Sequence, residues 1–328
     1  MLIKENCSLL PYNTFGMDVR AKVVAEYASV EELTDLLKKY KGERLLAVGE
    51  GSNLLFTKDF DGVVLVSRMC RARALKETDK EVWIEAESGL KMDNLIEQLV
   101  DMNLMGMENM SYIPGTVGAS AVQNVGAYGV EAKDVIERVE TIEITSSRTR
   151  VFTNKECRFG YRDSIFKNEL RGQYIVTKVV YRLQKDGELH PERLKIDNPH
   201  CTVADIREAV IAIRKSKLPE VGELGSAGSF FKNPVIRPEH YQTLSQQYPD
   251  MPHYVQEDGI KIPAAWLIEQ CGWKGKKQGG AQVYDKQPLV IVNADHATPE
   301  DIMTLAQAVC DSVQKKFGIS ISPEVNYI

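Results

Sequence analysis

Apolar residues recur along this chain at spacings that predict both helices and strands. A capping box formed by Ser29 and Glu32 predicts the start of a helix. One face of this helix is apolar and consists of Leu33, Leu36, Leu37 and Tyr40. Helical spacing also occurs at 92–99, 203–213, 264–271 and 302–313, the second and fourth of these following caps at Thr202 and Thr298. Alternating or continuous apolar runs predict strands at 44–48, 62–66, 82–86, 135–144, 175–183 and 289–293, and an apolar strand at 319–328.

Residues 112–129 break this periodicity, because nearly all their side chains are small and four are glycine. A glycine inside a helix costs about 1 kcal/mol relative to alanine, and a strand of small residues has little to bury. We therefore predict a loop whose backbone N–H groups approach a flat or anionic ligand, assisted by Thr116, Ser120, Gln123 and Asn124. A compact structural loop is the alternative. A second glycine-bearing loop at 49–53 favours one large cofactor held between the two.

The order of a strand, Gly49-Glu50-Gly51 and further apolar residues is similar to a dinucleotide-binding fingerprint. However, Leu54 stands where the third glycine belongs, and residues 53–57 have an extended rather than a helical pattern. We therefore predict that phosphates bind where the strand passes into the loop, and not at a helix N-terminus. Breaks in the pattern, including a flexible segment at 221–228, divide the chain into three predicted units, 1–66, 67–216 and 217–328.

Composition and charge narrow the function. The 328 residues are 43% hydrophobic and 27% charged, and the net charge is -5. Without clusters of Lys and Arg, we expect neither a nucleic-acid nor a membrane partner. We also expect no signal peptide and no membrane span. Six scattered cysteines indicate reduced thiols, hence a cytoplasmic protein without disulfides and with no metal site.

Three residues are the candidates for chemistry, since the common phosphate-loop, zinc-protease and serine-hydrolase motifs are absent. Arg162 stands between Tyr161 and Asp163, Ser229 precedes two phenylalanines, and Glu324 follows a proline in the terminal apolar segment. Taken singly, each has a structural alternative: an Arg–Asp ion pair, a turn serine and a solvated carboxylate.

Together these stretches resemble the UDP-N-acetylenolpyruvoylglucosamine reductase (MurB) family, type I branch, over nearly the whole chain. The matching segments are Asn13-Thr14-Phe15-Gly16, residues 49–53, residues 113–129, Tyr161-Arg162-Asp163-Ser164, residues 227–234, Gly279-Gly280-Ala281 and Pro323-Glu324-Val325. So many matches in the same order make the resemblance specific.

The resemblance implies an α+β fold. It has a two-part FAD-binding module of the vanillyl-alcohol-oxidase type (1–66 and 67–216) and a smaller α/β substrate-binding domain (217–328), whose C-terminal strand returns Glu324 to the flavin. It implies non-covalent FAD, NADPH as reductant and reduction of the enolpyruvyl group of a UDP-sugar. The implied cofactor-binding residues are Gly49, Gly51, Ser52, Asn53, Gly115, Thr116, Gly118, Gln123, Asn124, Gly126, Tyr128 and Arg214.

The resemblance also implies roles for the three candidates. Hydride addition at C3 of the substrate pushes negative charge toward its carboxylate, which Arg162 and a protonated Glu324 would stabilise while Ser229 delivers a proton to C2. The implied substrate-binding residues are Tyr161, His190, Lys217, Asn233 and Gln287. His190 aligns with a tyrosine that closes over the substrate in relatives, and Asn326 stands where relatives often have arginine.

Two other classes of protein compete with this hypothesis. A non-catalytic flavin-binding protein is disfavoured, because Arg162, Ser229 and Glu324 are all present. A sugar oxidase with covalent flavin is disfavoured because no histidine precedes His190, so neither flavin loop can supply the link. We expect a monomer whose partners are small molecules.

Overall fold

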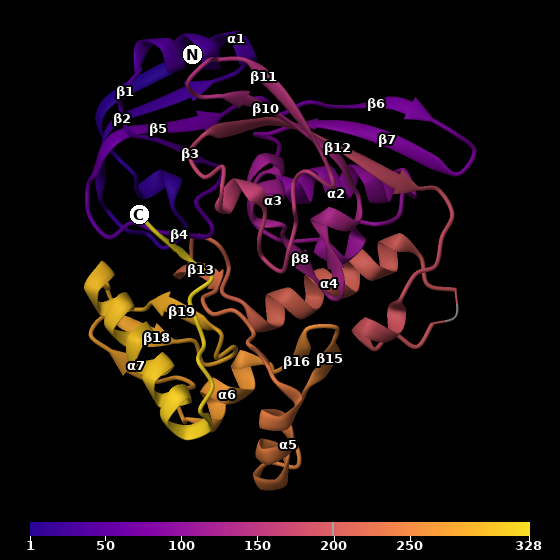
Figure 1. Ribbon diagram of the computed structural model, residues 1–328, viewed down its shortest axis with the longest axis vertical. Helices are drawn as coiled ribbons and strands as arrows, with labels where there is room; N and C mark the ends of the chain where they lie inside the picture. The colour runs from indigo at the N-terminus through magenta and orange to yellow at the C-terminus, as the bar shows by residue number, and fades with distance from the viewer. Residues whose placement is uncertain (199) are drawn as a thin grey trace. The chain divides into compact units, whose positions relative to one another are not determined.

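The computed structural model describes residues 1–198 and 200–328, and it divides the chain into two units (Figure 1). The first unit consists of Met1–Ser8, Arg20–Glu50 and Phe60–Arg214, and the second of Leu9–Val19, Gly51–Asp59 and Lys215–Ile328. Two short stretches from the beginning of the chain therefore belong to the same unit as its C-terminal third. No helix among the described residues is long and apolar enough to cross a bilayer.

A four-stranded sheet opens the first unit. Its order is β1 (Leu2–Ser8), β2 (Arg20–Tyr27), β5 (Phe60–Ser67) and β3 (Leu45–Val48), antiparallel only between β1 and β2. Helix α1 (Val30–Lys39) packs its predicted apolar face into the core under this sheet. Ser29 Oγ accepts from the N–H of Glu32 as predicted, but the Glu32 carboxylate accepts from the N–H of Ala28. The predicted strand at 44–48 exists, yet it is only partly buried because β3 lies at the sheet edge.

A five-stranded antiparallel sheet forms the rest of the first unit's framework. Its order is β11 (Thr149–Thr153), β10 (Ile136–Glu143), β12 (Tyr174–Gln184), β7 (Glu81–Glu87) and β6 (Ala72–Glu77). Helices α2 (Met92–Asp101) and α3 (Val117–Gln123) lie on one face of it (Figure 1). Val82, Ile84 and Ala86 alternate along β7 and join these helices in one core, as the period of two predicts.

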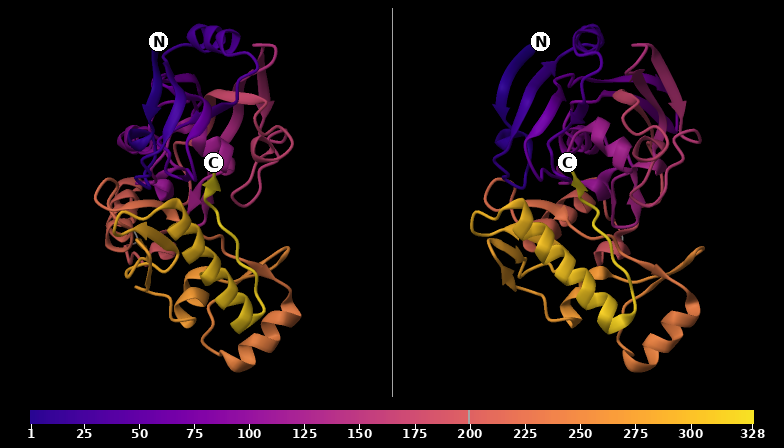
Figure 2. Two further views of the ribbon diagram at one scale, coloured as in Figure 1. Left: turned by 90° about the vertical axis from the view of Figure 1, so that its left-hand side faces the viewer. Right: turned by 60° about the vertical axis from the view of Figure 1, so that its left-hand side comes forward.

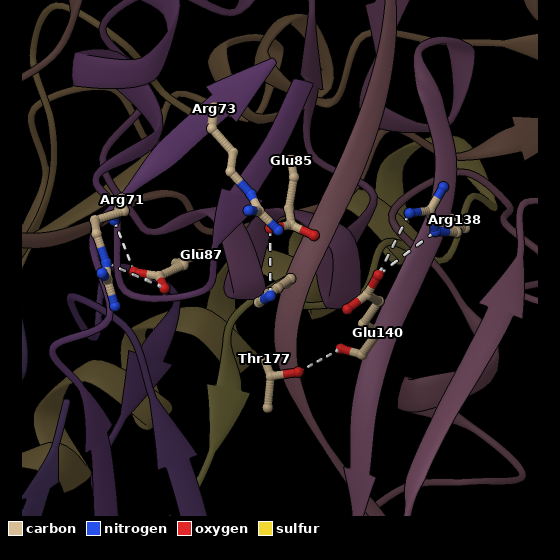
Figure 3. A network of polar contacts seen from close by, with 8 residues as sticks. Arg71, Arg73, Glu85, Glu87, Arg138, Glu140 and Thr177 are labelled. Carbon is tan, nitrogen blue, oxygen red and sulfur yellow. Dashed lines mark hydrogen bonds and ion pairs between the residues drawn. The ribbon is translucent and has the colours of Figure 1, made fainter. Parts of the chain in front are cut away.

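The opposite face of this sheet carries side chains of opposite charge in pairs (Figure 3). Glu85 is only 7% exposed, and its carboxylate lies 2.9 Å from Arg73 Nε and 3.3 Å from Lys178 Nζ. Burial raises the pKa of Glu85, but the hydrogen bonds from Arg73 and Lys178 outweigh it, so that the net shift is downward. Further pairs are Arg71–Glu87 and Arg138–Glu140.

Helix α3 lies inside the glycine-rich segment, where we predicted a loop, so that part of the prediction is wrong. Tertiary packing outweighs the low helix propensity here. A Cβ on Gly118 would lie 2.9 Å from the Cβ of Ser88, so only glycine allows the helix to approach β7 this closely. Ser120 Oγ donates to the Val117 carbonyl and lies 3.3 Å from the buried hydroxyl of Tyr181 on β12. Contacts with the sheet therefore stabilise the helix.

The first unit ends in two further features. A short hairpin follows α3, formed by β8 (Gly126–Ala127) and β9 (Val130–Glu131). Helix α4 (Val203–Lys217) begins with the predicted cap, in which Thr202 and Asp205 exchange hydrogen bonds. Its buried residues Ile206 and Val210 form a small core with Leu194, against which Tyr128 also packs.

The second unit is built on a sheet of order β13 (Gly225–Ser229), β19 (Val290–Asn293), β18 (Ala281–Val283) and β17 (Lys277–Gln278). Helix α7 (Pro299–Phe317) packs against β17, β18 and β19, and it has the predicted Thr298–Asp301 capping box and Gly318 at its end. Helix α6 (Ala264–Gln270) packs on α7 and ends where predicted, before Gly272. The chain then returns as an extended segment beside α7 (Figure 2).

Smaller elements complete the second unit. Strands β14 (Val235–Ile236), β16 (Gly259–Lys261) and β15 (Tyr254–Gln256) form a separate antiparallel sheet, next to helix α5 (Pro238–Gln247). The predicted terminal strand is confined to β20 (Asn326–Tyr327), which pairs in parallel with β4 (Leu54–Leu55). Glu324 therefore lies in an irregular stretch, and its predicted place within a strand is wrong.

Candidate active site

The two predicted cofactor loops meet in the first unit. A Cβ on Gly49 would lie 2.7 Å from Thr116 Oγ1, so the loops are in contact at this point. The N–H of Gly115 donates to a carboxylate oxygen of Glu50 at 2.7 Å, and the Glu50 carboxylate also lies 2.8 Å from Lys91 Nζ. Glu50 thus joins the loops directly, although the sequence did not identify it as a site residue. We call this contact the Glu50–Gly115 junction.

Several backbone amides that we expected to face a ligand are bonded within the protein. The N–H of Gly115 is held by Glu50, and the N–H of Gly118 donates to the Ser88 carbonyl at 3.0 Å. The N–H of Val117 likewise donates to the Leu90 carbonyl at 2.9 Å. The close approach that glycine allows is therefore used first by neighbouring protein segments, which changes the reason we gave for Gly115 and Gly118.

Gly51, Ser52 and Asn53 continue the first loop but belong to the second unit. Gly51 has φ +65°, and a Cβ there would lie 2.0 Å from the Tyr12 carbonyl oxygen. The Asn13-Thr14-Phe15-Gly16 motif explains this approach. The N–H of Thr14 donates to the Gly51 carbonyl, and its hydroxyl donates to the Ser226 carbonyl. The buried side chain of Asn13 donates to the carbonyls of Leu9 and Met17 and accepts from the N–H of Met17. The motif therefore holds the loop in place.

Asn124 and Gln123, at the end of α3, are committed to the protein through their side chains. Asn124 is fully buried with φ +49°, and its side chain contacts the Gly160 carbonyl at 2.7 Å, Glu131 at 3.1 Å and the N–H of Lys133 at 2.9 Å. Gln123 Oε1 accepts from Lys167 Nζ at 2.7 Å. Because both polar atoms of the Asn124 side chain are engaged, its predicted contact with a cofactor would have to come from the backbone. Gly126 is equally constrained, since a Cβ there would lie 2.5 Å from the Val130 carbonyl oxygen.

Arg162 projects from a tight turn in the first unit. The backbones of Gly160 and Asp163 exchange two hydrogen bonds of 3.0 Å, and Arg162 between them has φ +54°, a sparsely populated conformation that is often found at functional sites. Its guanidinium donates to the carbonyls of Asn124 and Gly126 and lies 5.3 Å from the Tyr161 ring. The turn therefore fixes a cation against the glycine-rich segment.

A second arginine approaches the same segment from α4. Arg214 Nε donates to the Tyr112 carbonyl at 2.9 Å, and burial lowers the pKa of its guanidinium. Within residues 1–198 and 200–328, Arg214 forms no ion pair. Tyr128, whose pKa burial raises, lies near this cation. Asp93 acts on it through its charge at longer range, but a half-buried cation with no carboxylate at ion-pair distance fits an anionic ligand such as a diphosphate.

Ser229 and Glu324 are brought together along the backbone of the second unit. The N–H of Glu324 donates to the Phe230 carbonyl at 2.7 Å, and Phe231 pairs with Pro323. Both phenylalanines are buried, so they anchor the strand, whereas Ser229 beside them is exposed and Glu324 is half-buried. The arrangement presents a hydroxyl and a carboxyl group from adjacent segments.

The same terminal segment continues to the predicted cofactor loop. The backbone N–H and the side-chain amide of Asn326 both donate to the Asn53 carbonyl, at 3.1 and 3.2 Å. The structure thus connects Ser229, Glu324 and Asn53 within the second unit and places Arg162 in the first.

The predicted substrate-binding residues are spread over both units. Tyr161 and His190 are in the first unit, where His190 Nδ1 lies 3.2 Å from Glu192. Asn233 Oδ1 accepts from the N–H of Ala264 at the start of α6. Within the described part of the chain, no hydrogen bond involves its NH₂ group, which can therefore donate to a ligand. Gln287 and the exposed Lys217 also belong to the second unit. Among the described residues, no group of three His, Cys, Asp or Glu side chains could hold a metal ion.

Comparisons with known proteins identify relatives of both units. Residues 21–150 match the model of an FAD binding domain, and residues 220–328 match that of the C-terminal domain of UDP-N-acetylenolpyruvoylglucosamine reductase. The chain is 44% identical over 337 residues to the UDP-N-acetylenolpyruvoylglucosamine reductase of Flavobacterium johnsoniae, covering 100% of both chains. It is 46% identical over 335 residues to the enzyme of the same name from Bacteroides fragilis, covering 99% of this chain and 100% of the relative.

A solved structure shares the fold. The crystal structure of UDP-N-acetylenolpyruvylglucosamine reductase (MurB) from Thermus caldophilus matches with a TM-score of 0.71 at 24% identity, covering 99% of each chain. The predicted α+β class with an FAD-binding module is confirmed.

Proposed function

The chain belongs to the UDP-N-acetylenolpyruvoylglucosamine reductase family, and from this membership we propose how its own residues carry the reaction. It is an FAD-dependent oxidoreductase that reduces UDP-N-acetylenolpyruvoylglucosamine for peptidoglycan synthesis, with NADPH as reductant. The two competing hypotheses, a non-catalytic flavin protein and a sugar oxidase, are thereby set aside. The residue roles, the monomeric state, the cytoplasmic location and the division at 1–66, 67–216 and 217–328 are our proposal.

The Glu50–Gly115 junction is the observation that carries the cofactor assignment. It brings Gly49 and Glu50 of the first predicted loop against Gly115 and Thr116 of the second, within the first unit. Arg214 supplies a cation near the start of the glycine-rich segment, which fits the diphosphate of FAD. We propose that these elements hold FAD without a covalent bond, together with the remaining predicted cofactor-binding residues.

When bound, FAD supplies to C3 of the enolpyruvyl group the hydride that it receives from NADPH. We propose that Arg162 then stabilises the negative charge that develops on the substrate carboxylate, because its guanidinium is held rigidly by the carbonyls of the glycine-rich segment. A rigid cation needs little reorganisation as the charge grows. Glu324 is proposed as the second side chain that faces this carboxylate.

Ser229 is proposed to deliver the proton to C2. Its hydroxyl is exposed, while Phe230 and Phe231 fix the backbone beside it, so the donor is both accessible and positioned. A hydroxyl is a weak acid at neutral pH, but an enolate-like carbon is a strong base, which makes the transfer feasible. Lys217, Asn233 and Gln287 are proposed to hold the UDP-sugar, together with Tyr161 and His190.

The visible spectrum of the purified protein tests this proposal. We expect a yellow protein that releases unmodified FAD on denaturation, bleaches with NADPH and regains its colour with UDP-N-acetylenolpyruvoylglucosamine. Reoxidation that is no faster with the substrate than in buffer without it would contradict the proposed reaction. Flavin that stays attached after denaturation would contradict non-covalent binding.

A further inference from the structure

One carboxylate joins three elements of the first unit: Asp93, in the first turn of α2, contacts both the glycine-rich segment and α4. Asp93 Oδ1 accepts from the N–H of Tyr112 at 2.6 Å and from Arg207 Nη1 at 2.6 Å, and Oδ2 accepts from Arg207 Nη2 at 3.2 Å. The Arg207 side chain is only 11% exposed. Two parallel bonds between a planar fork and a carboxylate fix orientation as well as distance. The pair therefore locks α4 to α2.

Tyr112 is held on both sides of its backbone. Asp93 accepts from its N–H, and its carbonyl accepts from Arg214 Nε at 2.9 Å. Tyr112 has φ +60°, a left-handed conformation that is unfavourable for a non-glycine residue and so needs support from its surroundings. The carbonyl that orients Arg214 therefore depends on Asp93.

Arg207 and Arg214 lie on the same face of α4. They are seven residues apart, which is close to two helical turns. Asp93 thus acts on Arg214 through the Tyr112 backbone, through Arg207 on the helix itself and directly through its charge. Burial lowers the pKa of Arg207, but the hydrogen bond and charge of Asp93 outweigh this and the net shift is upward. Arg207 consequently takes the side-chain hydrogen bonds of Asp93, which acts on Arg214 only at longer range, through its charge.

We propose that Asp93 and Arg207 are positioning residues, which fix the guanidinium of Arg214 for a diphosphate group. The inference rests on the proposed function, in which Arg214 faces the diphosphate of FAD. The UDP-sugar carries the same chemical group, so the experiment must separate the two sources. Neither Asp93 nor Arg207 is itself proposed to touch a ligand.

A double-mutant cycle on FAD binding tests the inference. The dissociation constant of FAD would be measured by flavin fluorescence for deflavinated wild type, Asp93→Ala, Arg214→Met and the double variant. Arg214→Met should weaken binding by about 10- to 100-fold, the effect of losing one charged hydrogen bond. Asp93→Ala should weaken it by about 5- to 20-fold when Arg214 is present, but by less than about 2-fold in the Arg214→Met background, because the two residues act through one contact.

Two further variants serve as controls. Glu97 lies 3.7 Å from Arg207 but is 64% exposed, so Glu97→Ala should stay within about 2-fold of wild type. Asp93→Asn keeps an acceptor for Tyr112 and removes the charge that faces Arg207, so its effect should be intermediate. It also keeps the inference testable if the alanine variant does not fold.

Additive losses would overturn the inference, since Asp93 would then act on the fold rather than through Arg214. If Arg214→Met leaves FAD affinity unchanged, the proposed role of Arg214 toward FAD fails by itself. The same cycle on the KM of the UDP-sugar then decides the inference: coupling there supports positioning for the substrate diphosphate, and no coupling in either cycle overturns it.

Discussion

Replacing Glu50 by alanine should loosen the Glu50–Gly115 junction without removing any group that we propose to touch the substrate. The change deletes the acceptor of the Gly115 N–H and the ion-pair partner of Lys91. The two glycine-bearing loops then keep their close approach at Gly49 and Thr116. We expect the binding surface for the flavin to open more often as a result.

The magnitude follows from the two contacts. The hydrogen bond to the carboxylate is 2.7 Å long and the Glu50 side chain is 27% exposed, so its loss should cost about 1.5–3 kcal/mol. Lys91 is 61% exposed, so solvent screening limits its ion pair to about 0–1 kcal/mol. A total of about 1.5–4 kcal/mol corresponds to an opening equilibrium that is roughly 10- to 1000-fold more favourable.

Hydrogen exchange of peptides covering residues 112–118, followed by mass spectrometry in the FAD-free protein, measures this opening. Glu50→Ala should exchange faster by about the stated factor in the regime where exchange reports the opening equilibrium. Glu50→Gln keeps an acceptor, so it should lose about 10-fold or less in protection. Lys91→Met removes only the exposed ion pair and should remain within about 5-fold of wild type.

FAD affinity supplies the result that would refute the reasoning. If the junction preorganises the loops, Glu50→Ala should weaken FAD binding by up to the same factor as the opening. If Glu50 instead occupies an amide that a phosphate of FAD needs, the alanine variant should bind FAD more tightly. Tighter binding, or unchanged exchange of residues 112–118, would show that the junction does not preorganise the site.

Three further predictions concern separate parts of the chain. Ser229→Ala should bleach with NADPH at a near-normal rate but reoxidise with substrate about 10²- to 10⁴-fold more slowly in stopped-flow absorbance, and equal losses in both steps would indicate a structural turn. Gly51→Ala should lower the melting temperature or prevent folding, because the added Cβ would lie 2.0 Å from the Tyr12 carbonyl oxygen at φ +65°. Burial raises the pKa of Cys157 to about 12, so its thiol stays protonated at pH 8 and should react with an aromatic disulfide reagent only after unfolding, whereas exposed Cys70 should react at once.

The elements that the sequence predicted well are those with local signals. Helix α7 has a capping box at Thr298, a periodic apolar face and a glycine at its end, and the structure reproduces all three. Strand β7 likewise follows its alternation. In each case, information that lies within a few residues of the element decides its conformation.

The mistaken predictions share the opposite cause. Helix α3 forms against its low propensity because Gly118 lets it pack closely on Ser88, a contact from another element. The Glu50–Gly115 junction and the role of Asp93 depend on pairs far apart in the chain, which no single-sequence pattern reveals. The site prediction relied on a family resemblance for the same reason: Arg162 and Ser229 carry no local signal that distinguishes a catalytic residue from an ion pair or a turn.

The pairing of β20 with β4 has a consequence for synthesis of the protein. Leu54 and Leu55 lie just after the first cofactor loop, yet their strand partner is Asn326–Tyr327. At about 5–20 residues per second, this partner emerges from the ribosome on the order of 15–50 s later. During that interval the loop that we assign to FAD has an unpaired edge, so the nascent chain should need a chaperone or the support of Tyr12 and Asn13 until translation is complete. Flavin capture is then expected to be a late, post-translational event.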